Sequence, residues 1–488
     1  MSERDQPQTS RRIVTLSLAS HTNVGKTTLA RTLLRRDVGE VLDQAHVTEL
    51  SEAYDLIEAD GAVLRLYDTP GFGDSARLLK RLVREKNRLL WFLQQTWDRF
   101  TDRPLWCSQQ AMLTVRDATD VVLYLVNAAE DPAEAGYVAP ELELLSWVGR
   151  PVLLILNQVG DGAADRTAVA RRRAAWQRHV EGFEVVKGVL DLDAFNRCWV
   201  QEGILFEAVV PLLPPAQRQD MERLARAWEA RNRRIFDRTV RQLARYLAGA
   251  AADRVILPEP RPGRAEKQAA MEELGGRLVR ATEALMAELL AAHGLEGTPP
   301  AEVERAVDAF VVAGEETLTP ERGALWGGIV SGALSGLAAD ALSGGLSLGG
   351  GLIAGAILGA LGGAGLARGY QLARGDESPE IRWSSTFLDR LASQTLLRYL
   401  AVAHYGRGRG AFQVFEEPER WRMAVAAARA AAGDAWLATW RRLTAGDWPP
   451  ETGERRLVPM VGAALEQVLA DAYPEAGPLL ATWRRTPS

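Results

Sequence analysis

The sequence has little cysteine and little histidine, and this scarcity limits the classes of protein to which it can belong. Only two cysteines occur in 488 residues, Cys107 and Cys198, and they lie far apart. Neither is part of a C-x-x-C pattern, so the sequence predicts no disulfide framework and no zinc site, and a reducing compartment fits. The five histidines show no spacing typical of metal ligands.

An excess of positive charge is also missing. The formal net charge is −5, which argues against binding of nucleic acid by bulk electrostatics, and we predict no DNA partner. Residues 1–12 are polar and lack the apolar core of a signal peptide, so we expect no secretion. The length of the chain predicts two or three domains.

One stretch near the N-terminus has the pattern of a phosphate-binding loop. Residues 20–28 read SHTNVGKTT, after the apolar run 13–19 and before a predicted helix at 28–36. This is the Walker A pattern G-x-x-x-x-G-K-[ST], with Ser20 at the first glycine. Backbone N–H groups of such a loop and the N-terminus of the following helix bind anions. Gly25 lets the backbone approach the phosphates, because it has no Cβ.

We therefore predict that this loop binds the phosphates of a nucleotide together with Mg²⁺. Lys26 is expected to reach the β- and γ-phosphates, and the Thr27 hydroxyl to ligate Mg²⁺. For His21, in the same loop, we expect a packing role. The other predicted nucleotide-binding residues of the loop are Asn23, Val24, Gly25 and Thr28.

A second signature, D-T-P-G at residues 68–71, follows a predicted strand at 62–67. We predict that Asp68 holds Mg²⁺ through water and that the Gly71 amide senses the γ-phosphate. Thr48, in the preceding loop, is the candidate for a switch threonine that closes onto Mg²⁺. The predicted catalytic residues are Lys26, Thr48 and Gly71, and the predicted Mg²⁺ residues are Thr27, Thr48 and Asp68.

The order of the predicted elements indicates an α/β fold. Continuous apolar runs at 121–127 and 152–157 are typical of buried parallel strands. Further strands are predicted at 53–57 and 183–190, and helices at 76–100, 108–119, 140–148 and 165–180. This alternation predicts a doubly wound sheet, with the ligand beyond the carboxyl ends of the strands. We assign residues 13–215 to this domain, after a disordered lead-in at 1–12.

Asn157 begins the sequence N-Q-V-G, where a guanine-reading N-K-x-D is expected. We predict that Asn157 binds nucleotide. Gln158 replaces the lysine and Gly160 the aspartate, while Asp161 stands one residue late. The carboxylate of such a motif accepts both guanine N–H donors, so the base specificity stays open, and no clear S-A-K motif follows residue 183.

Together these motifs resemble those of P-loop GTPases of the translation-factor-like class, and within it the Era and TrmE group. The whole chain looks like a bacterial subfamily of Era-like GTPases with a C-terminal domain of unknown function. The resemblance implies Mg²⁺-dependent binding of GTP and GDP and hydrolysis of GTP.

The same resemblance implies three further assignments. Asn23 stands where potassium-stimulated members carry an asparagine that helps to ligate K⁺, and Thr48 matches the second threonine of their G-T-T-R switch. Phe72 stands where Ras-like proteins have the water-orienting glutamine. We therefore expect slow GTP hydrolysis that a partner, a homodimer or a cation accelerates.

The second half of the chain predicts an all-α domain. Residues 216–262 read as a long amphipathic helix followed by a proline-rich linker, and residues 263–488 as the helical C-terminal domain. Within it, residues 323–369 contain glycines at G-x-x-x-G spacing, which predicts a glycine-rich helical hairpin. A membrane and the packed interior of a helical domain both suit such a hairpin, and we favour the membrane because residues 346–367 carry no charge.

Three functional hypotheses follow. The first is a cytoplasmic GTP switch at the inner face of the membrane, with residues 323–369 as the contact to a membrane or a membrane protein. The second is a membrane scaffold whose nucleotide is structural. The third is an RNA or ribosome assembly factor, which only analogy of fold supports.

Overall fold

The computed structural model describes residues 11–34, 52–72, 75–84, 103–158, 166–192, 194, 198–258, 261–294, 370–374, 379–405, 419–477 and 479–480. The chain divides into two compact units. The N-terminal unit comprises Met1–Arg233, His404–Gly410 and Glu475–Ser488, and the C-terminal unit comprises Arg234–Ala403 and Ala411–Pro474. The domain bounds taken from the sequence stay a prediction.

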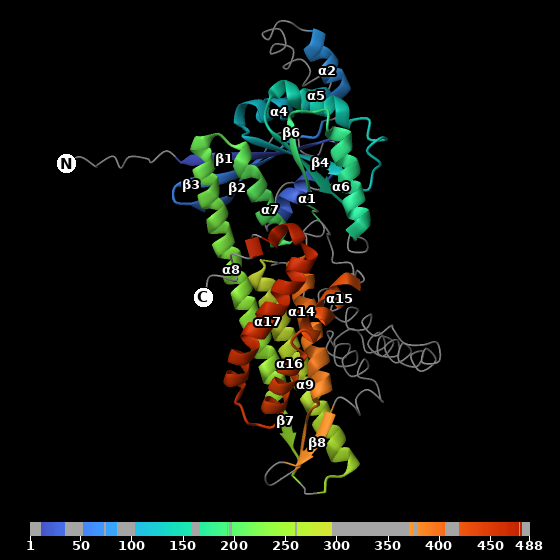
Figure 1. Ribbon diagram of the computed structural model, residues 1–488, viewed down its shortest axis with the longest axis vertical. Coiled ribbons are helices and arrows are strands. Elements are labelled where there is room, and N and C mark those ends of the chain that lie inside the picture. Colours follow the sequence, from blue (N-terminus) through green and yellow to red (C-terminus); the bar gives the residue numbers. More distant parts are fainter. Residues whose placement is uncertain are drawn as a thin grey trace, which may run out of the picture. The chain divides into compact units, whose positions relative to one another are not determined.

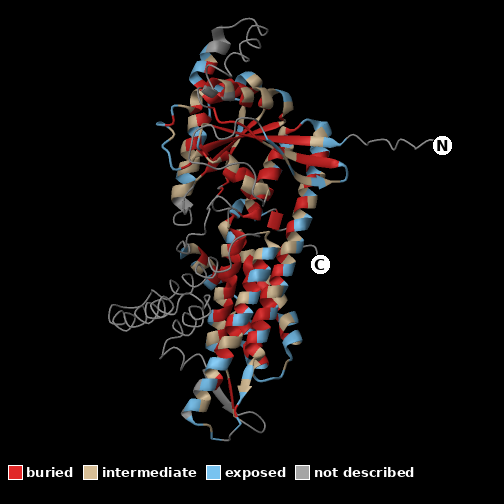
Figure 2. Cartoon of the chain, turned by 180° about the vertical axis from the view of Figure 1, so that it is seen from behind, coloured by how far each residue is buried: buried red, intermediate tan, exposed pale blue. Residues whose placement is uncertain are grey.

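A six-stranded sheet is the centre of the N-terminal unit (Figure 1). Its strand order is β2-β3-β1-β4-β5-β6. β2 is antiparallel to β3, and all other neighbours are parallel. The strands are β1 (Arg12–Ser20), β2 (Glu52–Ala59), β3 (Ala62–Asp68), β4 (Val121–Asn127), β5 (Val152–Asn157) and β6 (Val186–Asp191). The predicted α/β fold class is confirmed, and the four central strands of the sheet are mostly buried (Figure 2).

Six helices lie along the described chain between and after these strands. They are α1 (Lys26–Leu34), α2 (Ser75–Arg84), α4 (Arg103–Ala118), α5 (Val138–Val148), α6 (Arg166–Val180) and α7 (Trp199–Val209). The sequence predicted one helix over 76–100. The described helix α2 ends at Arg84, and residues 85–100 lie outside the described part.

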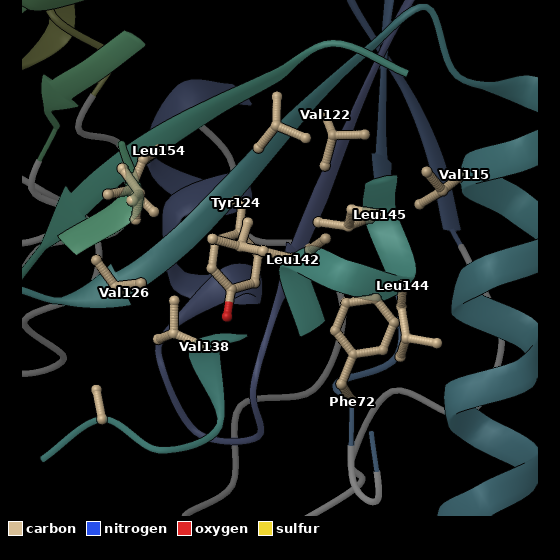
Figure 3. Close-up of a cluster of buried hydrophobic side chains, with 14 of the residues drawn as sticks. Phe72, Val115, Val122, Tyr124, Val126, Val138, Leu142, Leu144, Leu145 and Leu154 are labelled. Carbon is tan, nitrogen blue, oxygen red and sulfur yellow. The ribbon is translucent and has the colours of Figure 1, made fainter. Parts of the chain in front are cut away.

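One face of β4 carries the core that surrounds α5. Val122, Tyr124 and Val126 alternate along the strand, so their side chains point to the same face of the sheet. They pack with buried residues of α4, α5 and α6 in one cluster (Figure 3). This core fixes α5 next to the loop that follows β1, which matters for the site described below.

The C-terminal unit is mainly helical, as the sequence predicted. The long helix α8 (Pro215–Ala252) contains the division between the units, after Arg233. The other helices are α9 (Arg264–Ala292), α14 (Ser385–Ala403), α15 (Glu419–Ala430), α16 (Gly433–Thr444) and α17 (Pro450–Ala472). A Cβ at Gly453 would lie 2.4 Å from Leu443 Cδ2, so α16 and α17 pack closely at this point.

A small antiparallel sheet also belongs to the C-terminal unit, and the sequence did not predict it. Its order is β7-β9-β8, formed by β7 (Arg254–Ile256), β8 (Tyr370–Arg374) and β9 (Pro379–Trp383). β7 is three residues long, and its partner β9 lies far away in the sequence, so no local pattern indicates the pairing. Buried Glu380 of β9 forms ion pairs with Arg254 and Arg382.

The glycine-rich hairpin predicted at 323–369 lies outside the described residues. Among the helices that the structure describes, none combines the length and the apolar character needed to span a membrane.

Candidate functional site

The loop between β1 and α1 has the backbone that its glycine predicts. Asn23 and Gly25 have φ angles of 63° and 94°, in the left-handed region. A Cβ at Gly25 would also lie 2.9 Å from the Asn157 Nδ2 atom. α1 begins at Lys26, so the unpaired N–H groups and the positive end of its dipole adjoin the loop. The loop therefore offers an anion-binding site.

Lys26 is buried inside this loop, with 8% of its surface exposed. Its Nζ donates to Ser20 Oγ at 3.0 Å and lies 3.5 Å from the His21 carbonyl oxygen. Burial lowers the pKa of Lys26, and the nearby carboxylates of Asp68 and Glu141 act in the opposite direction. Both hydrogen-bond partners are neutral oxygens, so the ammonium suits an anionic ligand such as a phosphate.

Thr27 and Asp68 bring the two sequence signatures together. The Thr27 hydroxyl donates to Asp68 Oδ2 at 2.6 Å, and Asp68 is 1% exposed at the end of β3. Burial raises the pKa of Asp68, while the Thr27 hydrogen bond and Lys26 act to lower it. The other carboxylate oxygen, Oδ1, is buried without a hydrogen-bond partner among the described residues.

These oxygens fit Mg²⁺. Hydroxyl and carboxylate oxygens are ligands that Mg²⁺ prefers, and the second oxygen of Asp68 has acceptor capacity left. Within the described ranges no group of three or more His, Cys, Asp or Glu could hold a metal ion. When Mg²⁺ is bound, Thr27 and Asp68 are the described residues that would hold it, and the ion would neutralise phosphate charge.

Gly71 lies against the phosphate loop. A Cβ at this position would come within 3.0 Å of Thr22 Cγ2 and 3.2 Å of Lys26 Nζ. The next residue, Phe72, donates its backbone N–H to the Ser20 carbonyl oxygen at 2.9 Å. The D-T-P-G segment and the loop are thus in direct contact at the end of β1.

The Phe72 side chain is part of the hydrophobic core. It is fully buried in the cluster that contains Tyr124, Leu142 and Leu145 (Figure 3). A buried phenyl ring has no polar atom with which to orient a water molecule. The position that carries glutamine in Ras-like proteins is therefore a packing position in this chain.

Asn157 ties two loops together at the end of β5. Its Nδ2 donates to the Val24 carbonyl oxygen at 2.7 Å, and its Oδ1 accepts from the Ala194 N–H at 2.9 Å. The Ala194 carbonyl oxygen in turn accepts from Thr32 Oγ1 at 3.0 Å. Ala194 was not predicted from the sequence, because no S-A-K pattern marks it; only its place after the last strand of the sheet could have indicated it.

The structure places most of the predicted site residues around one loop. Those with a contact in the site are Val24, Gly25, Lys26, Thr27, Asp68, Gly71 and Asn157. Asn23 is exposed in the loop, and Thr28 is buried in α1. Thr48, Gly160 and Asp161 lie outside the described residues. The functional roles of all these residues stay predictions.

His21 has the packing contact that we expected from the sequence, and also a polar one. Its ring stacks on Tyr137, with the ring centroids 4.6 Å apart. Its Nδ1 lies 2.8 Å from Oε1 of Glu141, a fully buried residue of α5. Glu141 was not predicted from the sequence, because no motif contains it.

Two protein-family models match the chain, one over its N-terminal part and one over most of the remainder. Residues 15–158 match the model of the family described as "50S ribosome-binding GTPase". Residues 185–455 match the model described as "Domain of unknown function (DUF3482)". A comparison with curated proteins gives no significant match.

Solved structures of Era are among the similar folds. One is Era in complex with MgGDPNP and a segment of 16S ribosomal RNA, with 16% identity, a TM-score of 0.31 and coverage of 42% of this chain and 57% of that chain. Another is a variant of Aquifex aeolicus Era bound to GDP and AlF4⁻, with 15% identity, a TM-score of 0.32 and coverage of 57% of this chain and 90% of that chain. Because the domain of unknown function covers more than half of the 488 residues, the protein belongs to the DUF3482 family, and its N-terminal part is a P-loop GTPase domain.

Proposed function

We propose that this protein is a Mg²⁺-dependent molecular switch that binds and hydrolyses GTP and relays its nucleotide state to the helical C-terminal region. One observation carries the proposal. The Thr27–Asp68 hydrogen bond joins the phosphate loop to the end of β3, and the buried Lys26 and Gly71 lie beside it. A nucleoside triphosphate and its metal ion need these groups close together.

The proposed roles follow from the chemistry of each group. Lys26 binds the β- and γ-phosphates, and Thr27 and Asp68 hold Mg²⁺, which neutralises the charge of the phosphates when it is bound. Gly71 offers its backbone amide to the γ-phosphate, next to the loop that Lys26 occupies. Loss of the γ-phosphate then removes one contact of the segment after β3, which is a known way to switch a loop.

We further propose that Asn23 accelerates GTP hydrolysis by helping to ligate K⁺. Asn23 is exposed at the surface of the loop and has a left-handed backbone. A side-chain amide oxygen suits an alkali cation. Replacement of K⁺ by Na⁺ should lower GTP turnover if Asn23 acts in this way, and Asn23→Ala should remove the difference.

We also propose that residues 323–369 bring the switch to the cytoplasmic face of a membrane, alone or as a homodimer. The support is the glycine-rich sequence of this segment, which carries no charge over residues 346–367. The liposome arm of the experiment below tests the membrane proposal, and the molar mass of the GTP-bound protein tests the dimer.

The test is phosphate release from GTP and from ATP in K⁺ buffer, with and without liposomes, with Lys26→Ala as the blank. We expect release from GTP that requires Mg²⁺, that liposomes accelerate and that the blank lacks. Equal release from GTP and ATP would contradict guanine selectivity. No release from either nucleotide would contradict the proposal of a GTP-hydrolysing switch.

The buried Phe72 favours a second candidate, a scaffold with a structural nucleotide. Because its phenyl ring lies in the core, this position provides no group that orients the attacking water. Nucleotide that co-purifies with the protein and stays unhydrolysed over hours would favour the scaffold. The RNA alternative stays a prediction, and salt-dependent association with RNA or ribosomes would test it.

A further inference from the structure

The phosphate loop contacts a second buried carboxylate besides Asp68, that of Glu141. Glu141 lies in the first turn of α5 and is fully buried. Its Oε1 lies 2.8 Å from His21 Nδ1, and its Oε2 accepts the Tyr124 hydroxyl at 2.8 Å. Both oxygens of this carboxylate are therefore used, one by the loop and one by β4.

The ordinary interpretation is a buried carboxylate that its neighbours satisfy. Burial raises the pKa of Glu141, and His21, Tyr124 and Lys26 act to lower it. A buried carboxylate costs free energy, and an apolar residue would serve packing alone at least as well. This cost indicates that the carboxylate has a role beyond packing, and its hydrogen bond to His21 is the candidate for that role.

His21 connects Glu141 with the groups that meet a nucleotide. Its carbonyl oxygen lies 3.5 Å from Lys26 Nζ, and its backbone forms an isolated parallel bridge with Phe72. Its ring is held between the carboxylate and the stacked ring of Tyr137. The ring contacts and the backbone bridge together restrict the position of His21 in the loop.

The loop has a second polar anchor, three residues further on. Asn157 donates to the carbonyl oxygen of Val24, so the loop is held from β5 at Val24 and from α5 at His21. Between the two anchors lie only Thr22 and Asn23, and Asn23 is held in a left-handed conformation. A short loop fixed at both ends keeps its N–H groups in one arrangement before a ligand arrives, which reduces the entropy lost on binding.

We propose that Glu141 is a positioning residue for the phosphate-binding loop and that it acts through His21. The inference rests on the proposed binding of nucleotide by this loop. Because the loop meets the phosphates that GDP and GTP share, the effect belongs to the affinity for both nucleotides and not to the hydrolytic step.

The experiment measures Kd for fluorescent GDP and for a fluorescent, non-hydrolysable GTP analogue, together with KM and kcat for GTP. The variants are Glu141→Gln, His21→Ala, His21→Asn and the double variant Glu141→Gln/His21→Ala. The matched control is Glu143→Gln, which changes an exposed carboxylate two residues along the same helix.

We expect Glu141→Gln to weaken binding of both nucleotides about tenfold and to raise KM equally, with kcat within about twofold of the parent, because the charge-assisted hydrogen bond between the imidazole and the carboxylate becomes an ordinary one. His21→Ala removes the same hydrogen bond and should have at least the same effect, and the double variant should add nothing to His21→Ala. His21→Asn should restore most of the affinity, since its amide can replace the Nδ1–H donor. Glu143→Gln should leave Kd unchanged.

Whether the nucleotide affinity of Glu141→Gln falls or rises distinguishes a positioning role of Glu141 from a purely electrostatic one. Glu141 lies close enough to Lys26 to affect its pKa, so its removal alone would favour an anionic ligand. Tighter binding in Glu141→Gln would therefore overturn the proposal. Weaker binding of the GTP analogue alone would assign the effect to Gly71. Additive losses of affinity in the double variant would show that Glu141 acts without His21. Each of these results would also overturn the proposal.

Two controls keep the result interpretable. Thermal unfolding without nucleotide reports whether a variant is folded, and the two His21 variants test the proposal by themselves if Glu141→Gln does not fold. A parent protein that binds neither nucleotide contradicts the proposed function. A parent that binds both, with unchanged Kd in all the variants, contradicts only the role of Glu141.

Discussion

The candidate site has a phosphate end, around Lys26 and Asp68, and a base end, at Asn157. The two ends differ in how many side chains suit the part of the nucleotide that each would meet. At the phosphate end, a buried lysine, a hydroxyl–carboxylate pair and a closely packed glycine meet within one loop and its neighbour. At the base end, Asn157 uses its side chain to hold Val24 and Ala194. The sequence there reads N-Q-V-G, with Gly160 where a carboxylate would read guanine.

This difference indicates that affinity and base selection are separate properties of the site. Phosphates and Mg²⁺ carry charge, and buried charged groups contribute most of the interaction with them. Selection of a base needs a donor or acceptor aimed at its edge, because a site rejects the wrong partner when its own polar groups stay unpaired. Substitutions at the two ends should therefore have effects of different size and kind.

The largest effect is expected at Lys26. Lys26→Ala removes the buried ammonium beside Ser20, and loss of a buried charge from its partner costs about 2–5 kcal/mol. Binding of GTP and GDP should weaken by a factor of about 30 to 5,000. A titration with fluorescent nucleotide measures this, with the exposed lysine variant Lys187→Ala as the control. Parent-like affinity in Lys26→Ala would remove the phosphate assignment of the whole loop.

Asp68→Asn should weaken Mg²⁺-dependent binding of GTP but stabilise the nucleotide-free protein. We expect Mg²⁺-dependent affinity for GTP to fall by about 10–100-fold, because the carboxylate beside Thr27 is gone. Without Mg²⁺, the variant should be more stable than the parent by about 1 kcal/mol, since a buried charge is removed. Titration with and without Mg²⁺ and thermal unfolding of the nucleotide-free protein measure the two effects.

The pH dependence of stability checks the same residue. Burial raises the pKa of folded Asp68 above the value in the unfolded chain. The folded state then binds the proton more tightly, so the contribution to stability is largest at low pH and is lost as the pH rises through the folded-state pKa. Asp68→Asn should lack this contribution. Identical pH profiles for parent and variant would contradict the assignment of a costly buried charge.

The phosphate end was also the part that the sequence could predict. Its residues belong to local patterns, Walker A and D-T-P-G, and the central strands β4 and β5 of the same sheet are apolar runs that end where predicted. Glu141 could not be found in this way. It stands in the sequence ELELLSWV beside Glu143, and only the three-dimensional packing makes one of them buried and the other exposed.

Non-local pairing explains the other differences. Ala194 reaches Asn157 only because β5 and β6 are neighbours in the sheet, and Arg254 of β7 meets Arg382 of β9 across a long stretch of chain. Such contacts depend on the tertiary fold and leave no periodic signal in the sequence. The helices of the C-terminal unit do have a periodic signal in the sequence. For this reason they could be predicted, and the small sheet could not.

A smaller effect is expected at Gly71. In Gly71→Ala the new Cβ would meet Thr22 and Lys26, so the segment after β3 must shift away from the loop. Binding of a non-hydrolysable GTP analogue should weaken about tenfold, with GDP within about twofold, because only GTP has the γ-phosphate. The control Gly182→Ala has open space around the new Cβ. Equal losses for GDP and the analogue would show that Gly71 supports the loop instead of sensing the γ-phosphate.

The smallest expected change concerns the base end and is a ratio of affinities. Asn157→Ala leaves the Val24 carbonyl and the Ala194 N–H without their partners, so binding of GTP and ATP should weaken about tenfold each. The ratio of the two affinities should change by less than about twofold, because both lost contacts are to protein groups. Asn127→Ala, at the end of the neighbouring strand, is the control. A ratio that falls with Asn157→Ala would mean that this carboxamide reads guanine, and the base end would then be as specifically built as the phosphate end.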